Sequence, residues 1–262
     1  IAMVIGAGQS PGETMGNGRA TALIFAREGA KVVAVDRDLS SAEDTAVMIR
    51  DEGGHAMAVA ADVKDEAAVA AAVAECLGRH GRVDILHNNV GISLAGGDAE
   101  VTKITLEAFD HCVAVNLRGM VLTCKHTLPV MREQGSGAIV NISSLAAWSA
   151  YPLVAYKTTK AAVIALTEQL AIQNAKYGIR ANVILPGLMD TPMAVDTRVK
   201  VLQQTREEIV ARRDAQVPLG GKMGTGWDVA NAAMFLCSDE ASFITGAVLP
   251  VDGGSSVALG GG

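Results

Sequence analysis

Tyr156 and Lys160, four positions apart, are the residues of this sequence best suited to proton-transfer chemistry. On a helix, residues at this spacing share one face, about 6 Å apart along the axis. A free tyrosine has a pKa of about 10 and is a poor base at neutral pH, but a nearby ammonium favours the phenolate and lowers that pKa. The pair is suited to removing a proton from an alcohol or returning one to a ketone. Ordinary helix faces show the same spacing, so the pair predicts a site only together with the rest of the chain.

The composition indicates one large core and argues against several classes of function. Of the 262 residues, 50% are hydrophobic and 28 are glycine, which is enough for a sizeable single domain. The 22 basic and 28 acidic residues give a net charge of −6 without a basic block, so we expect no nucleic-acid partner. The five histidines lack ligand spacing, so we predict no metal site. No apolar run reaches membrane-spanning length, so we expect no membrane partner.

The cysteines indicate a reducing compartment. None of them forms a Cys-x-x-Cys motif, and most lie within helical patterns. We therefore expect reduced packing residues in a cytoplasmic protein. They are Cys76, Cys112, Cys124 and Cys237.

Short apolar runs alternate with helical patterns along the chain, which is typical of βαβ units and a parallel sheet. Strands are predicted at 2–5, 31–35, 55–60, 83–87, 138–142, 179–185 and 247–250. Helices are predicted at 18–28, 41–52, 66–79, 106–132, 154–177, 198–214 and 227–237. We therefore expect an α/β fold with one doubly wound parallel sheet of seven strands and helices on both faces. One domain covers residues 1–262, with a substrate lid at about 188–214 and a flexible tail at 260–262.

A glycine-rich turn joins the first predicted strand to the first predicted helix. The strand ends at Gly6 and Gly8, and the helix begins near Gly16, Asn17 and Gly18. Glycines allow a tight turn and let a pyrophosphate approach the helix N-terminus, where unpaired N–H groups and the dipole favour anions. The position between a strand and a helix favours phosphate binding over a plain glycine-rich connection.

The residues after the second and third strands are candidates for the adenosine site. Asp36 follows Gly18 by 18 residues, and a carboxylate there can accept hydrogen bonds from both ribose hydroxyls. It would repel a 2′-phosphate, which favours NAD(H) over NADP(H); Arg37 weakens this prediction because an arginine can bind that phosphate. A loop carboxylate or helix cap is the alternative for Asp36. Asp62 and Val63 could flank the adenine.

Two asparagine-containing sites, a turn and a helix position, each have a functional and a structural interpretation. Asn88, Asn89, Val90 and Gly91 follow the fourth strand beside the expected cleft, although such residues also form ordinary turns. Asn116 lies within a long apolar helical pattern, where a side-chain amide needs hydrogen-bond partners. A buried structural asparagine is the alternative there.

Taken together in this order, these residues resemble the short-chain dehydrogenase/reductase family in its compact branch. The resemblance covers nearly the whole chain and implies a Rossmann-like fold. It rests on the glycine turn, Asp36, Asp62-Val63, Asn88-Asn89-Val90-Gly91, Asn116, Asn141-Ile142-Ser143-Ser144, Tyr156-Lys157-Thr158-Thr159-Lys160, Pro186-Gly187 with Thr191, and Pro250-Val251-Asp252-Gly253-Gly254.

The resemblance also implies a mechanism. Tyr156 would take the substrate hydroxyl proton while hydride moves from carbon to nicotinamide. Lys160 would hold the nicotinamide ribose and keep the tyrosine pKa low, and a serine would fix the substrate oxygen. Asn116 would hold a water that links Lys160 to solvent. The residues implied to bind the cofactor are Gly6, Gly16, Asn17, Gly18, Asp36, Arg37, Asp62, Val63, Asn89, Val90, Gly91, Tyr156, Lys160, Pro186, Gly187 and Thr191.

Two spacing rules of the family disagree about the serine. Counting from Asn141 at the strand end selects Ser144, whereas counting back from Tyr156 selects Ser143. Side chains alternate along a strand, so only one of the two can face the cleft easily. Loop lengths vary more readily than strand register, and we therefore predict Ser144.

The chain departs from the family pattern at the glycine turn. Nine residues separate Gly6 from Gly16, six more than in the family pattern, and the extra residues fall in Gln9–Met15. This segment is either a flap over the pyrophosphate or a surface bulge. Ile5 stands where the family usually has threonine, and Val90 where it usually has alanine. Despite these departures, we expect NAD to bind.

The substrate side is predicted at 93–103, 145–153 and 188–214. Trp148 and Tyr151 there favour an apolar secondary alcohol or ketone, although core or subunit packing would explain both as well. We expect an NAD-dependent alcohol dehydrogenase or ketone reductase, acting on a small molecule as a homotetramer. The alternatives are an NADPH-linked 3-oxoacyl-type ketoreductase and a non-catalytic dinucleotide-binding scaffold.

Overall fold

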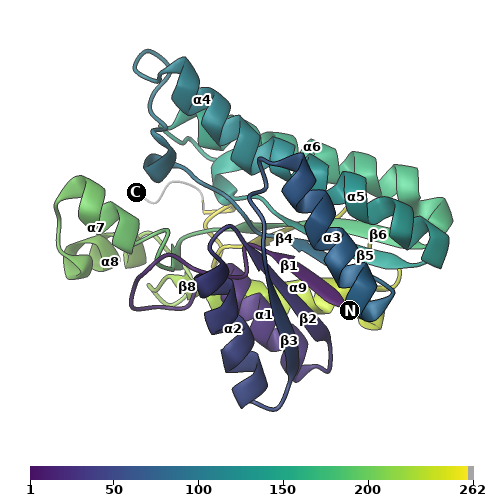
Figure 1. Ribbon diagram of the computed structural model, residues 1–262. Coiled ribbons are helices and arrows are strands. Elements are labelled where there is room, and N and C mark those ends of the chain that lie inside the picture. The colour runs from purple at the N-terminus through teal and green to yellow at the C-terminus, as the bar shows by residue number, and fades with distance from the viewer. Residues whose placement is uncertain (259–262) are drawn as a thin grey trace.

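Seven strands form one parallel sheet in the order β3-β2-β1-β4-β5-β6-β9 (Figure 1). The computed structural model describes residues 1–258. The strands are β1 (Ala2–Ile5), β2 (Lys31–Asp36), β3 (His55–Ala60), β4 (Ile85–Asn88), β5 (Gly137–Ile142), β6 (Ile179–Pro186) and β9 (Val248–Val251). All seven predicted strands are confirmed, with ends shifted by at most two residues. The strand order reverses between β1 and β4, so the cleft for a ligand is expected at their carboxyl ends.

Helices cover both faces of this sheet (Figure 1). They are α1 (Asn17–Arg27), α2 (Leu39–Asp51), α3 (Glu66–His80), α4 (Leu106–Val113), α5 (Gly119–Gln134), α6 (Val154–Asn174), α7 (Asp196–Leu202), α8 (Arg206–Asp214) and α9 (Gly226–Cys237). Short 3-10 turns are η1 (Leu94–Gly96), η3 (Leu145–Ala147), η4 (Ala175–Tyr177) and η5 (Asp239–Ala241).

Alternation along the strands divides the core into two layers. On β1, Met3 and Ile5 pack with residues of α3, α5 and α6. Ala2 and Val4 point to the other face and pack with residues of α1 and α9. Successive side chains of a strand point to opposite faces of the sheet. A strand that is apolar at every position therefore needs helices packed on both faces to bury it. The doubly wound α/β fold is therefore confirmed.

Two predicted helices are wrong in detail, and two short strands were missed. The helix predicted at 106–132 contains a π-helical segment, η2 (Ala114–Arg118), between α4 and α5. The helix predicted at 198–214 is two helices, because Gln203 adopts a left-handed φ of 54° and Thr205 begins α8 with a capping box. The strands β7 (Met189–Asp190) and β8 (Gly224–Thr225) were not predicted, since two residues are too few to show a periodic pattern.

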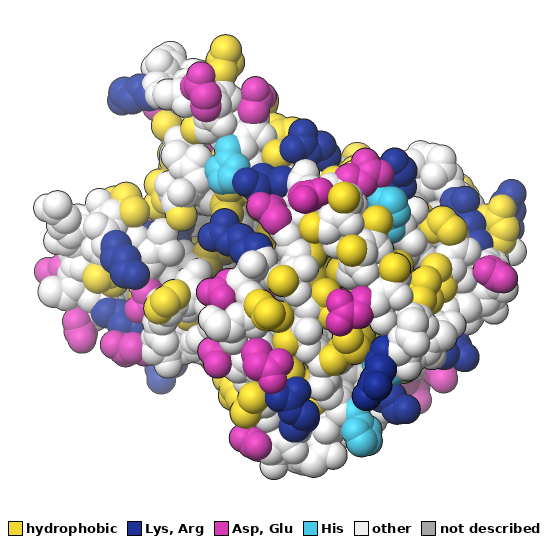
Figure 2. Space-filling view, in the orientation of Figure 1, with side chains coloured by type: hydrophobic (Ala, Val, Ile, Leu, Met, Phe, Trp, Pro, Cys, Tyr) yellow, Lys and Arg dark blue, Asp and Glu magenta, His cyan; other side chains and the backbone are white. Residues whose placement is uncertain are grey.

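Further observations bear on the classes of function. No helix within residues 1–258 is long and apolar enough to cross a membrane. The four cysteines are buried and free. On the face shown in Figure 2, acidic and basic side chains are interspersed. The predicted domain and tail extend to residue 262, and residues 259–262 lie outside the described part of the chain.

Candidate active site

A cavity of about 550 Å³ lies at the carboxyl ends of the strands. Its walls run from the glycine turn, past β4 and β5, to α6 and the lid. Every residue predicted to bind the cofactor lines this cavity, as does Ser144. Asn116 is the predicted site residue that does not line it. The fold therefore brings together segments that lie up to 185 residues apart, from Gly6 to Thr191.

The glycine turn is clamped so closely that it excludes side chains. Gly6 has a left-handed φ of +83°, and a Cβ on Gly18 would lie 1.9 Å from the Gly6 oxygen. The Asn89 Nδ2 donates to the same oxygen at 3.1 Å. Gly16, at the start of α1, has no side-chain cap, and the buried Asn17 Oδ1 has no hydrogen-bond partner within residues 1–258. Free N–H groups at a helix start are suited to a pyrophosphate, so these residues fit a dinucleotide.

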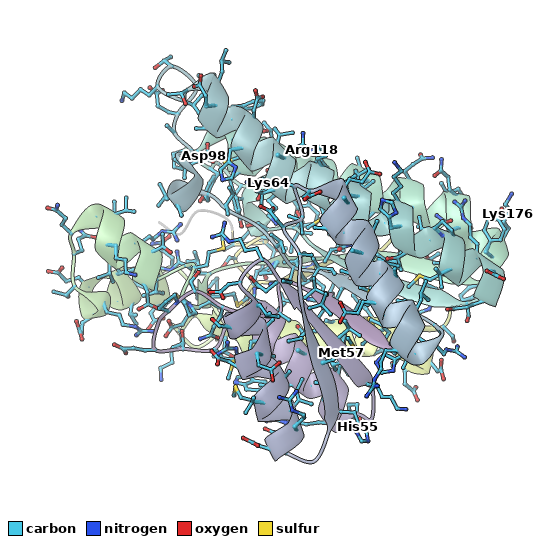
Figure 3. The ribbon with its side chains drawn as sticks, viewed as in Figure 1. His55, Met57, Lys64, Asp98, Arg118 and Lys176 are labelled. Carbon is cyan, nitrogen blue, oxygen red and sulfur yellow. The ribbon has the colours of Figure 1, made fainter. Side chains whose placement is uncertain are left out.

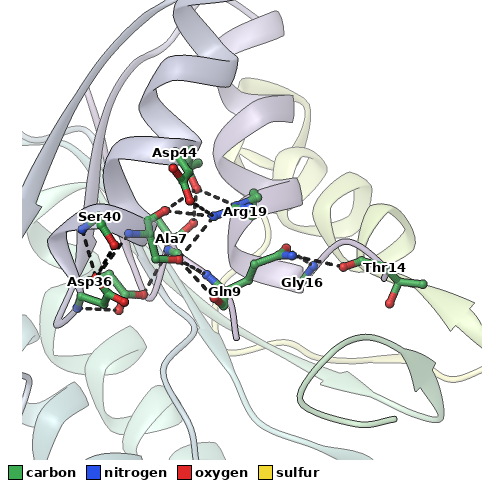
Figure 4. A network of polar contacts seen from close by, with 12 residues as sticks. Ala7, Gln9, Thr14, Gly16, Arg19, Asp36, Ser40 and Asp44 are labelled. Atoms are coloured by element: carbon green, nitrogen blue, oxygen red, sulfur yellow. Dashed lines mark hydrogen bonds and ion pairs between the residues drawn. The ribbon is translucent and has the colours of Figure 1, made fainter. Parts of the chain in front are cut away.

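Asp36 lies at the end of β2, beside the turn (Figure 4). Its two carboxylate oxygens accept from the Gly8 and Asp38 backbone N–H groups, each at 3.1 Å. A Cβ on Gly8 would lie 2.9 Å from the carboxylate. Arg19 reaches toward α2 instead, where its Nε donates to Thr45 Oγ1 at 2.8 Å. Two acidic side chains line the cavity where β2 ends, Asp36 and Asp38, and Asp38 is occupied in capping α2.

The other residues predicted at the adenosine side differ in their surroundings. Arg37 is exposed and lines the cavity next to Asp36. Asp62 is paired with Lys64, 3.4 Å between Oδ2 and Nζ. Val63 is buried and packs against Gly119, where a Cβ would lie 2.8 Å from the valine side chain.

Tyr156 and Lys160 lie on the first two turns of α6. Lys160 is 2% exposed, and its Nζ donates to the Ile142 carbonyl oxygen at 2.8 Å. That Nζ lies 5.6 Å from the Tyr156 ring centroid. Burial lowers the pKa of Lys160 to about 8, because a low-dielectric site disfavours the ammonium.

The expected lowering of the tyrosine pKa is not produced by the protein's own groups. Burial raises the pKa of Tyr156 to about 12, and the hydroxyl of Ser144 opposes this rise. The charges of Arg198 and Arg213 also oppose it. Desolvation of the phenolate therefore outweighs these neighbouring groups.

The two serines at the end of β5 have different partners. Ser143 Oγ donates to the Lys160 backbone oxygen at 2.6 Å and is buried, so it fastens α6 to the sheet. Ser144 Oγ accepts from the Ala146 N–H at 3.2 Å and is close enough to Tyr156 to influence its pKa. Both serines line the cavity, but the Ser143 hydroxyl is engaged with the Lys160 backbone; the substrate-binding role of Ser144 stays a prediction.

Asn116 lies in the π-helical segment η2. Its Nδ2 donates to the Ile92 oxygen at 2.9 Å and to Thr159 Oγ1 at 3.1 Å, and its Oδ1 accepts from the Ile92 N–H at 2.7 Å. Both amide donors are therefore engaged, and they fasten the segment after β4 to α6. The water-relay role of Asn116 stays a prediction.

Residues at the end of β6 line the part of the cavity where the nicotinamide is expected. A Cβ on Gly187 would lie 2.6 Å from the Asp252 Cβ, and the Gly187 N–H donates to the Val251 oxygen at 2.9 Å. Pro186 ends β6, and Thr191 is buried at the start of the lid.

Two residues that position Tyr156 were not found from the sequence. Asp98 is 5% exposed and lies between η1 and α4 (Figure 3). Its oxygens accept from the Ala155 N–H at 2.9 Å and the Tyr156 N–H at 2.8 Å, which caps α6 from a distant part of the chain. Lys157 Nζ donates to the Ala146 oxygen at 3.2 Å. The lack of a capping side chain at Leu153 was the single local signal for a distant cap.

The insertion Gln9–Met15 lies between the glycine turn and the lid. Gln9 Oε1 accepts from the Gly16 N–H at 2.9 Å. Glu13 Oε2 lies 3.5 Å from the Nε of Arg206 on α8. Because the segment also lines the cavity, the geometry favours a flap over a surface bulge.

Within residues 1–258, no three His, Cys, Asp or Glu side chains are grouped so that they could hold a metal ion.

Comparison with known proteins places the chain in a family. Residues 12–256 match the family model described as enoyl-(acyl carrier protein) reductase. A 2-(R)-hydroxypropyl-CoM dehydrogenase from Xanthobacter autotrophicus is 39% identical over 246 residues, which cover 92% of this chain and 95% of the relative.

Solved structures agree with this match. A crystal structure of a levodione reductase is 34% identical, covers 98% of each chain and has a TM-score of 0.91. A Burkholderia xenovorans structure designated a short-chain dehydrogenase/reductase is 42% identical, covers 98% of this chain and 96% of its own, and has a TM-score of 0.89. The chain therefore belongs to the short-chain dehydrogenase/reductase family of nicotinamide-dependent oxidoreductases.

Proposed function

We propose that this protein is an NAD-dependent oxidoreductase that interconverts a secondary alcohol and its ketone, with Tyr156 as the acid–base group. One observation carries the proposal. Tyr156 and Ser144 both line the cavity that also contains the glycine turn and Asp36, and the Ser144 hydroxyl is close enough to lower the pKa of Tyr156. A bound nicotinamide dinucleotide supplies the hydride acceptor or donor.

The side chains divide the proton chemistry between them. In alcohol oxidation, the hydroxyl proton moves to the phenolate form of Tyr156 while the carbinol hydrogen leaves as hydride to the nicotinamide. Because burial raises the pKa of Tyr156, the phenolate needs a further nearby positive charge, which the oxidised nicotinamide ring would supply when bound. Ser144 holds the substrate oxygen in place for both transfers. Lys160, whose pKa burial lowers to about 8, can change its charge near neutral pH and is suited to pass the proton toward solvent.

The acidic end of β2 supports NAD as the cofactor. The Asp36 carboxylate would accept from ribose hydroxyls and repel a 2′-phosphate. The exposed Arg37 at the same wall favours the second candidate, an NADPH-linked 3-oxoacyl-type ketoreductase. Comparing kcat/KM for NADH and NADPH decides between them.

Substitution of the tyrosine tests the proposal. Tyr156→Phe removes the acid–base hydroxyl and keeps the ring, so turnover of secondary alcohols, followed by NADH absorbance, is expected to fall at least about 10²-fold. Tyr177→Phe is the matched control, because Tyr177 lies in η4, directly after α6, and does not line the cavity. Undiminished turnover in Tyr156→Phe would contradict the assigned role. A wild-type protein that binds NADH but turns over no alcohol or ketone would support the non-catalytic scaffold.

We also propose a homotetramer built on the long helices and the last strand. Val121 on α5 and Ile172 on α6 are exposed, and Phe243 before β9 is fully exposed. Contact between copies would remove this apolar surface from water. Light scattering coupled to size exclusion tests it, with four times the mass of the chain expected.

A further inference from the structure

Arg213 of α8 carries a buried charge for which the lid provides no acidic partner. It is 8% exposed and lines the cavity. Its Nε lies 3.1 Å from Met223 Sδ, and its Nη2 donates weakly to the Met189 oxygen at 3.4 Å. Within residues 1–258, no carboxylate lies within ion-pair distance of it, and its Nη1 makes no hydrogen bond. A buried, incompletely paired guanidinium is costly, so the site favours an incoming anion.

Arg198 of α7 is a second cation at the same cavity wall. Its Nη1 donates to the Ala194 oxygen at 2.6 Å, and it has no ion pair with any described carboxylate. Burial, together with the charge of Arg198, lowers the pKa of Arg213 to about 10, and the charge of Asp190 opposes this lowering without forming an ion pair. Both arginines lower the pKa of Tyr156, so their charges act on the reacting end of the cavity.

The acidic residues of the lid are directed elsewhere. Arg206 pairs with Asp190 at 2.6 Å, with Glu13 at 3.5 Å and with Asp196 at 3.7 Å. Three carboxylates therefore converge on Arg206, which does not line the cavity. The two arginines that do line it are left with positive charge directed toward the substrate space.

We propose that Arg198 and Arg213 form a subsite for a singly charged oxyanion, a carboxylate or a sulfonate, carried by the substrate. This rests on the proposed function, because the carbinol carbon would lie at Ser144 and Tyr156 while the anionic end lies under α7 and α8. Each lid helix contributes one guanidinium, which can donate two parallel hydrogen bonds to such an oxyanion. The substrate class is then a secondary alcohol, or ketone, with an acidic tail.

Matched substrates test this subsite. The panel contains secondary hydroxy acids of increasing chain length, the corresponding hydroxysulfonates, and the methyl esters of the hydroxy acids. The wild type should prefer one anionic series over the neutral esters in kcat/KM, and higher ionic strength should reduce that preference. The carboxylate and sulfonate arms show which oxyanion is bound.

The variants are Arg198→Met, Arg213→Lys and Arg212→Met. Loss of a charged hydrogen-bond donor should lower the anionic-to-neutral ratio of kcat/KM about 10- to 100-fold in Arg198→Met. Arg213→Lys should lower it less, because the charge remains but the paired donors are lost. Arg212→Met is the control, since Arg212 is exposed and bonded to Gln204. An unchanged ratio in Arg198→Met, or an equal loss in Arg212→Met, overturns the proposal.

A binding measurement separates failure of the subsite from failure of the proposed function. Hexanoate and hexanesulfonate, but not hexanamide, should raise the thermal midpoint of the wild type and of Arg212→Met. Arg198→Met should lose this rise. Equal shifts with hexanamide, or a shift retained in Arg198→Met, refute the subsite whether or not any alcohol is turned over. Turnover of neutral alcohols alone refutes the subsite and leaves the oxidoreductase proposal intact.

Discussion

Asp98→Ala should damage both the stability of the protein and the placement of Tyr156, the proposed acid–base residue. The Asp98 carboxylate accepts from the Ala155 and Tyr156 N–H groups at 2.9 Å and 2.8 Å. Ala155 is fully buried, and Leu153 offers no side-chain cap to replace the carboxylate. The substitution therefore leaves two donors at the start of α6 without an acceptor.

The structure sets the size of the effect. An unsatisfied buried donor costs about 1–3 kcal/mol, so two of them should lower the free energy of unfolding by about 2–6 kcal/mol. For a protein of this size, each kcal/mol lowers Tm by about 2–4 °C. Because the frayed residue is Tyr156 itself, a shift of about 1 Å should lower kcat by about 10²-fold.

Asp65→Ala is the matched control. Asp65 caps α3 by accepting from the Ala67 and Ala68 N–H groups at 2.9 Å and 3.3 Å. These contacts are exposed and do not line the cavity, so the expected loss is about 1 kcal/mol with kcat retained.

Thermal unfolding by circular dichroism and steady-state kinetics of the two variants give the answer. Asp98→Asn, which keeps the shape and one acceptor, should fall between wild type and Asp98→Ala in both measurements. If Asp98→Ala loses no more stability than Asp65→Ala and keeps its kcat, the capping argument is refuted.

Three further predictions follow from single residues. Lys160→Met should abolish turnover. The pKa of Lys160 is about 8 in the folded state against 10.5 for the free group, so the unfolded state binds more protons between these pH values. The stability of the wild type should therefore rise with pH, relative to that of Lys160→Met, by up to about 3 kcal/mol. Urea titrations at several pH values measure this, and parallel stability curves for the two proteins would show that the charge is not buried. Asp36→Asn removes the like charge that opposes a 2′-phosphate and should raise the NADPH-to-NADH ratio of kcat/KM about 10- to 100-fold; an unchanged ratio would mean that the carboxylate does not select the cofactor. Gly18→Ala would place its Cβ 1.9 Å from a backbone oxygen of the turn and should weaken NADH binding, measured by fluorescence titration, at least about tenfold. Gly78→Ala is the control, because its Cβ would meet nothing within 4 Å. It should stabilise the fold by about 0.5–1 kcal/mol and keep the affinity for NADH.

Local patterns predicted the fold well. Short runs of four to seven residues placed each strand, and the strand Ala2–Ile5 was predicted with the bounds observed. The spacing of Tyr156 and Lys160 placed both on one helix face because helix geometry depends on the nearest four residues. Glycines at 6, 16 and 18 marked the turn because close backbone approach excludes a side chain there.

The sequence by itself determined the order of the strands and helices, the glycine turn and the tyrosine–lysine pair, because each depends on residues close together in the chain. Tertiary structure alone decided that Asp98 caps α6, that Ser143 turns to the Lys160 backbone, and that the lid leaves Arg198 and Arg213 without acidic partners. Partners of this kind come from segments 16 or more residues apart, and burial raises or lowers a pKa only once distant elements have packed around the group.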